Sequence, residues 1–105
     1  MTDFHSPSKD RLFKAILGLR DIEECYDFFE DLMTIKEMED MAQRMDTAVL
    51  LSRGTAYQQI SREVGVSTAT ISRVNRCLQY GTGGYRRALG RLAASEAEAE
   101  EEKKL

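Results

Sequence analysis

The 105-residue sequence contains no tryptophan, one proline, one histidine and two cysteines. Pro7 lies near the start of the chain, so no proline interrupts a helix after it. Cys25 and Cys77 form no Cys-x-x-Cys pair and have no histidine at metal-ligand spacing, which predicts reduced thiols and no metal site. Because His5 is the only histidine and no nucleophile has a partner, we expect neither an enzyme nor a bound cofactor.

Long hydrophobic runs are also absent. No stretch reaches the roughly 18 apolar residues that a membrane-spanning helix needs, so we expect no membrane partner. The N-terminus lacks the basic segment followed by an apolar segment that marks a secretory signal, which favours a cytoplasmic protein. The length is typical of one domain, and a hydrophobic content of 42% is enough for a small core.

Charge is unevenly distributed along the chain. The net charge is −5 for residues 1–54, +5 for residues 55–94 and −3 for residues 95–105. The middle segment holds six arginines and a single acid, Glu63. This segment is therefore the one that can approach a polyanion such as DNA, although a chance cluster of solvated arginines is the alternative.

The spacing of apolar residues predicts an all-α fold. We expect one domain over residues 1–94, with dimerisation helices over 1–54, a helix-turn-helix over 55–80 and a C-terminal helix over 81–94. Thr34 and Glu37 have the spacing of a capping box at the start of a long helix, as do Thr55 and Gln58 for the next helix. The acidic tail, residues 95–105, is expected either to extend the last helix and fray or to be disordered.

The helix expected over residues 22–33 is apolar over a wide arc. Its apolar side chains cover more than one stripe: Ile22, Cys25, Tyr26, Phe28, Phe29, Leu32 and Met33. Such a helix needs cover on two sides. A chain of this length lacks enough surface of its own to supply that cover.

Residues 57–76 have the pattern of a helix-turn-helix. Five apolar positions fit this motif: Ile60, Val64, Val66, Ile71 and Val74. The first helix is expected to bury Ile60 and Val64, and the second to bury Ile71 and Val74. Gly65 can take the positive φ that a short turn between crossing helices needs, and the small side chain of Ser61 lets the helices approach closely.

The second helix of this motif starts with short side chains, which let its backbone approach base edges in the major groove. Arginines follow one turn later, where guanidinium groups can bind phosphate or guanine, and polar residues of the first helix suit backbone phosphates. The candidate DNA-binding residues are Gln58, Gln59, Arg62, Ser67, Thr68, Ala69, Ser72, Arg73 and Arg76. An ordinary helical hairpin with a Ser/Thr-rich cap is the alternative.

Residues 30–92 resemble the Trp repressor superfamily, and within it the YerC/YecD group of Trp-repressor-related proteins. The resemblance rests on the stretches LMTIKEMEDMAQRMDTAVLLSRG, QQISREVGVSTATISRVNRCL and YGTGGYRRAL. It implies an all-α, six-helix, Trp-repressor-like bundle in which two chains intertwine through their N-terminal helices. Such a homodimer would read two half-sites about one DNA turn apart, roughly 34–36 Å.

The resemblance also implies a candidate effector pocket. In the tryptophan-responsive members the indole lies between two arginines, whose positions Arg44 and Arg73 occupy here, and Thr34 matches a pocket threonine. Val74 stands where those members have glycine, and Cys77 replaces a serine that holds the polar end of the ligand. Overfilling a packed site costs about 1–3 kcal/mol, so we expect any small-molecule effector to differ from tryptophan. Arg44 could equally pair with acids on its own helix face.

These features together predict a sequence-specific DNA-binding transcriptional regulator, a repressor, that acts on double-stranded DNA as a homodimer. The alternative is a dimeric adaptor or RNA-binding module that uses the same scaffold without operator specificity. The segregated arginines and the short side chains of the second helix favour DNA.

Overall fold

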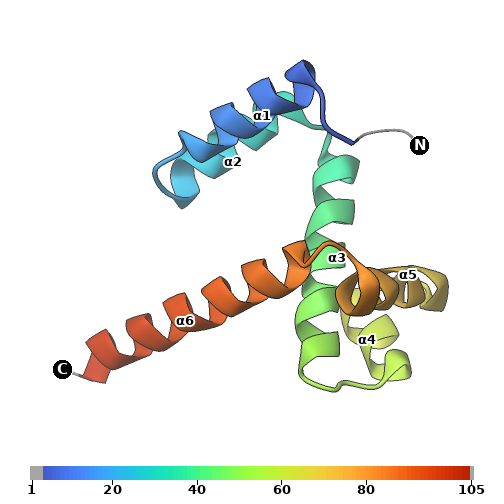
Figure 1. Ribbon diagram of the computed structural model, residues 1–105. Coiled ribbons are helices and arrows are strands. Elements are labelled where there is room, and N and C mark those ends of the chain that lie inside the picture. Colours follow the sequence, from blue (N-terminus) through green and yellow to red (C-terminus); the bar gives the residue numbers. More distant parts are fainter. Residues whose placement is uncertain (1–3, 105) are drawn as a thin grey trace. The chain divides into compact units, whose positions relative to one another are not determined.

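The computed structural model describes residues 4–104, which form six α-helices and no β-strand (Figure 1). In chain order these are α1 (Pro7–Leu17), α2 (Ile22–Leu32), α3 (Ile35–Ser52), α4 (Tyr57–Val64), α5 (Thr68–Tyr80) and α6 (Gly84–Lys104). The prediction of an all-α fold is therefore confirmed. The chain divides into two compact units, Met1–Met38 and Glu39–Leu105, and α3 begins in the first unit and continues into the second.

Polar caps begin the helices of the first unit. The Ser6 hydroxyl accepts a hydrogen bond at 3.1 Å from an amide in the first turn of α1, and Pro7 follows it at the first helical position. At the start of α2 the Asp21 carboxylate accepts from the Glu24 amide at 2.9 Å, while the Glu24 carboxylate accepts from the Arg20 amide at 2.9 Å. These bonds satisfy amides that a helix start leaves without an intrahelical partner.

Several large apolar side chains of α1 and α2 remain exposed in the single chain. Neither helix has a buried residue, and the side chains of Leu17, Ile22 and Tyr26 are 83%, 73% and 69% exposed. One chain therefore does not cover the wide apolar arc that the sequence places on α2.

A reciprocal capping box begins α3, as the sequence predicts. The Thr34 hydroxyl accepts from the Glu37 amide at 3.1 Å, and the Glu37 carboxylate accepts from the Thr34 amide at 2.9 Å. The bond from the Thr34 backbone, followed by the one involving its side chain, lowers the pKa of Glu37 below its usual value of 4.5. The Thr34 hydroxyl is thus engaged at the start of its own helix.

The end of α3 corrects one expectation from the sequence. Gly54 has a φ of +79°, and the Thr55 amide donates to the Leu50 carbonyl at 3.1 Å, so both residues close α3. α4 then begins after Ala56, which makes no side-chain capping hydrogen bond. The capping box expected at Thr55 and Gln58 is therefore wrong, because Thr55 completes the last turn of α3 and lies one residue too early to cap α4.

The core of the second unit lies where α4, α5 and the end of α3 meet (Figure 1). Ile60, Val66 and Ile71 form its centre, and the two isoleucines are completely buried. Side chains of α3 and α4 pack against this cluster: Leu50, Leu51, Tyr57 and Val64. Val74 and Leu78 continue the buried face along α5. The helix-turn-helix is therefore held together by the apolar positions that its spacing predicts, and α3 completes their cover.

A glycine-rich loop joins α5 to α6. Gly81 ends α5, and its amide donates to the Cys77 carbonyl at 2.9 Å. A Cβ atom at Gly81 would collide with that carbonyl, so glycine is required for close approach. The Arg86 guanidinium donates from Nε to the Leu78 carbonyl at 2.9 Å, which attaches the start of α6 to the end of α5.

α6 extends through the acidic segment. The helix runs to Lys104 and thus includes most of residues 95–105, whereas Leu105 lies outside the described residues. Alanine, glutamate and lysine all favour helix, and Lys103 and Lys104 in the last turn complement the helix dipole. Across residues 4–104, none of the helices is both long and apolar enough to span a membrane.

Candidate nucleic-acid interface

The candidate interface is built on the turn between α4 and α5. Gly65 follows the last residue of α4 and has a φ of +83°, a left-handed conformation that other residues rarely adopt. The Gly65 amide donates to the Ser61 carbonyl at 3.0 Å and so closes the last turn of α4. The positive φ expected for Gly65 is confirmed, and it lets α5 leave the turn in a new direction.

Two side chains donate hydrogen bonds to the backbone carbonyl groups of the residues on either side of Gly65. The Ser61 hydroxyl donates to the Val66 carbonyl at 2.7 Å, across the turn. Gln43 of α3 donates from Nε2 to the Val64 carbonyl at 3.4 Å, a longer contact. The turn is therefore held from α4 and from α3 as well as by its own backbone.

The first turn of α5 is capped by Ser67. The Ser67 hydroxyl accepts from the Thr70 amide at 3.1 Å and donates to the Thr70 hydroxyl at the same distance. Ser67 is therefore the N-cap residue of α5. Its hydroxyl is thus engaged in the cap, whereas Thr68 is the first helical residue and is exposed.

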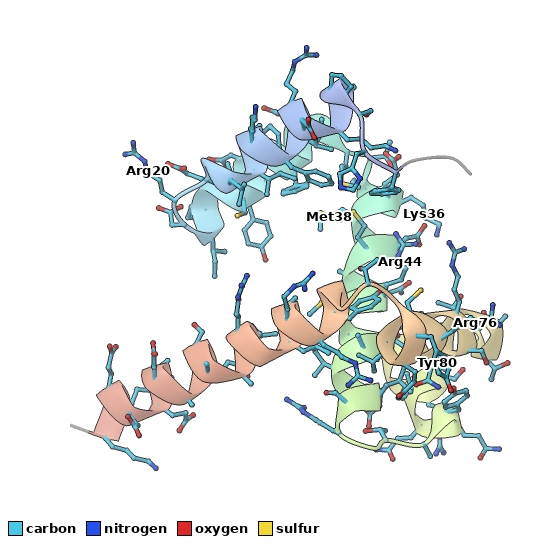
Figure 2. All side chains as sticks on the ribbon, viewed as in Figure 1. Arg20, Lys36, Met38, Arg44, Arg76 and Tyr80 are labelled. Carbon is cyan, nitrogen blue, oxygen red and sulfur yellow. The ribbon has the colours of Figure 1, made fainter. Side chains whose placement is uncertain are left out.

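The two faces of α5 differ in polarity. Its inner face buries Ile71, Val74 and Leu78. Its outer face is exposed and carries the candidate DNA-binding residues Thr68, Ala69, Ser72, Arg73 and Arg76. Short side chains come first, the arginines follow, and no acidic residue occurs in α5. Figure 2 shows Arg76 extending outward from this helix.

α4 contributes the remaining candidate residues, Gln58, Gln59 and Arg62, all of which are exposed. Gln59 donates from Nε2 to Glu63 Oε1 at 2.8 Å, so its amide is engaged along its own helix. Gln58, near the start of α4, and Arg62, near its end, are both exposed, and such polar groups can bind backbone phosphates.

Tyr80 is a further candidate that the sequence pattern did not single out. It is 87% exposed and follows Arg76 by four residues, on the same face of α5 (Figure 2). An exposed tyrosine beside an arginine can contact the sugar–phosphate backbone of a duplex. Continuing the helical spacing from Ala69 through Arg76 to the end of α5 would have identified it.

The candidate effector residues are distributed over both units. Thr34 lies in the first unit, and Arg44 is exposed on α3 in the second. Arg73 and Cys77 are exposed on α5, whereas Val74 is 2% exposed and belongs to the core. An open pocket of about 440 Å³ in the second unit has a different lining: Leu51, Ser52, Leu78, Gln79, Arg86 and Leu89. The effector pocket therefore stays a prediction.

The cysteines are free thiols in different units, with Cys25 partly buried on α2 and Cys77 exposed on α5. Within residues 4–104, no three side chains of histidine, cysteine, aspartate or glutamate come together in an arrangement that could hold a metal ion.

The crossed pair α4 and α5, joined by the Gly65 turn, defines a helix-turn-helix protein. Residues 8–93 match the family model described as Trp repressor protein. YerC of Bacillus subtilis (strain 168), an uncharacterized protein, is 52% identical over 90 residues, which cover 86% of each chain. The crystal structure of a TrpR-like protein from Eubacterium eligens ATCC 27750 is similar at 48% identity, with a TM-score of 0.81, covering 84% of this chain and 91% of that one.

The chain therefore belongs to the Trp repressor family, a family of DNA-binding regulators. The resemblance that the sequence indicates is confirmed, and so is the Trp-repressor-like helical fold that it implies.

Proposed function

We propose that this protein is a homodimeric, sequence-specific DNA-binding transcription regulator that represses by occupying its operator. The observation that carries the proposal is the outer face of α5. That face is fully exposed, begins with small side chains, continues with Arg73 and Arg76, and has no acidic residue. Such a surface fits the major groove, where small residues permit close approach and arginine can bind guanine or phosphate.

In this proposal α4 and α5 contact different parts of the DNA. The first turn of α5, including Thr68 and Ala69, reads base edges, while Gln58 and Arg62 of α4 bind phosphates on the flanking backbone. The net charge of +5 over residues 55–94 attracts the duplex as a whole. Binding to chromosomal DNA would require a cytoplasmic location, which stays a prediction.

In this proposal a second copy of the chain buries the exposed apolar side chains of the first unit. Leu17, Ile22 and Tyr26 are too exposed for a stable isolated unit, and Ile35 at the start of α3 is 81% exposed. Burying these side chains between two copies is the arrangement that the family resemblance implies. It would place two copies of α5 on one duplex.

Replacing Arg76 by alanine tests whether this surface binds phosphates. We expect weaker binding to every duplex, and a plot of log affinity against log salt concentration that is shallower by about 1, because one phosphate contact is lost. Arg20→Ala is the matched control, since it removes the same charge from an exposed position outside residues 55–94. An Arg76→Ala slope equal to that of the unaltered protein would remove Arg76 from the phosphate contacts.

A further inference from the structure

The small size of Ser61 does not by itself explain its role in the turn, because its hydroxyl also donates a hydrogen bond to the Val66 carbonyl. Both the backbone carbonyl and the side-chain hydroxyl of Ser61 bond to turn residues, at 3.0 Å to the Gly65 amide and at 2.7 Å to the Val66 carbonyl. Ser61 is half-buried, Val66 is 9% exposed, and the bond between them lies in partly buried surroundings. A carbonyl in such surroundings is costly to leave without a donor.

The bonded carbonyl lies immediately before the cap of α5. Val66 is followed by Ser67, which caps the helix, and then by Thr68, the first residue of the outer face. The Val66 side chain is also fixed, because it packs with Ile60 and Ile71 in the core. The Val66 carbonyl is therefore held by Ser61 of α4, and the Val66 side chain is held by the core. The peptide group that follows Val66 leads directly into the cap of α5, so its position sets where α5 starts.

We propose that Ser61 is a positioning residue for sequence discrimination: its hydroxyl fixes the start of α5 so that the outer face meets base edges in one geometry. The proposal rests on the proposed DNA-binding function and assigns Ser61 no contact with DNA. Base contacts depend on this geometry, because hydrogen bonds weaken steeply with distance and angle. Long, flexible arginines reach phosphates over a wider range of helix orientations, so nonspecific binding should tolerate a small shift of α5.

Ser61→Ala separates the hydrogen bond from the small size of the residue. Alanine is no larger than serine, so the close approach of α4 and α5 is kept while the Val66 carbonyl loses its donor. Ser61→Thr keeps the hydroxyl. Ser52→Ala is the matched control, because the Ser52 hydroxyl makes a similar bond at 2.6 Å to the Val49 carbonyl on α3.

The experiment measures affinity for a duplex selected from a random pool and for its scrambled version, over a range of salt concentrations. We expect Ser61→Ala to reduce the ratio of the two affinities by roughly fivefold, the typical net effect of one hydrogen bond. Its affinity for the scrambled duplex and its salt slope should be unchanged. Ser61→Thr should recover most of the ratio, and Ser52→Ala should keep it.

Two results would overturn the inference while leaving the proposed function intact. One is an unchanged affinity ratio in Ser61→Ala. The other is an equal loss on both duplexes, which a merely structural role would produce. If the unaltered protein itself failed to distinguish the duplexes, the proposed function would fail first.

A measurement without DNA tests the geometry separately. In amide NMR spectra, the resonances of residues 65–70 should shift in Ser61→Ala and stay in place in Ser52→Ala. Unshifted resonances in Ser61→Ala would show that the bond does not hold the turn, whatever the DNA result.

Discussion

Replacing Ile71 by alanine is expected to lower the free energy of unfolding by about 2–5 kcal/mol. Ile71 is completely buried on the inner face of α5 and packs with Ile60 and Val66 at the centre of the second unit. The substitution removes buried apolar surface and leaves a cavity between α5 and α4. Because a small domain has only about 5–15 kcal/mol of stability in total, much of it would be lost.

Chemical denaturation followed by circular dichroism measures this loss. Ile71→Val is the graded control, since it removes a single methylene and should cost only about 0.5–1.5 kcal/mol. A loss below 1 kcal/mol for Ile71→Ala would mean that this side chain does not lie at the centre of the core.

Replacing Thr68 by tryptophan is expected to abolish discrimination between DNA sequences. Specific sites are typically bound at least about a thousandfold more tightly than other DNA, and this preference should disappear. Thr68 is the first helical residue of α5 and is exposed, so an indole there would hold the helix backbone away from base edges. The fold should be kept, because the side chain lies outside the core.

Affinity for the selected duplex and for its scrambled version gives the readout. Ser95→Trp is the control, because it adds the same side chain at an exposed position of α6 and should keep the preference. The chain has no other tryptophan, so the emission of the new indole also reports its own surroundings on binding. Discrimination that survives in Thr68→Trp would contradict the assignment of α5 as the recognition helix.

Much of the second unit could be predicted because the patterns that determine it involve residues close together in the sequence. The spacing of Ile60, Ile71 and Val74 indicates which faces of α4 and α5 are buried, and the structure buries all three. Gly65 was identifiable because few residues tolerate a positive φ. In the first unit, the start of α3 after Thr34 likewise followed from the reciprocal spacing of a capping box.

Other features depend on contacts that spacing does not encode. Thr55 has the spacing of a helix cap, but its amide donates to the Leu50 carbonyl and so closes α3 instead. Ser61 reads as a small residue at a helix crossing, and its bond to the Val66 carbonyl becomes visible only when the path of the turn is known. The division into two units depends on which parts of the chain contact one another, which a count of apolar residues does not reveal.

The candidate interface likewise has features that could be predicted from the sequence and features that could not. Its exposed positions on α5 follow from helical periodicity, as Tyr80 also would have done. The engagement of Ser67 in the helix cap and of Gln59 with Glu63 could not be read from residue types, because both side chains have several possible partners. Which of these groups bind DNA stays a prediction.

Selection of binding sites from a pool of random duplexes tests the central claim most directly, that two copies of α5 read DNA. The account predicts an enriched sequence with two inverted half-sites, whose centres lie about one DNA turn apart, roughly 10–10.5 base pairs. Recovery of no common sequence, or of a single half-site without its inverted mate, would contradict it.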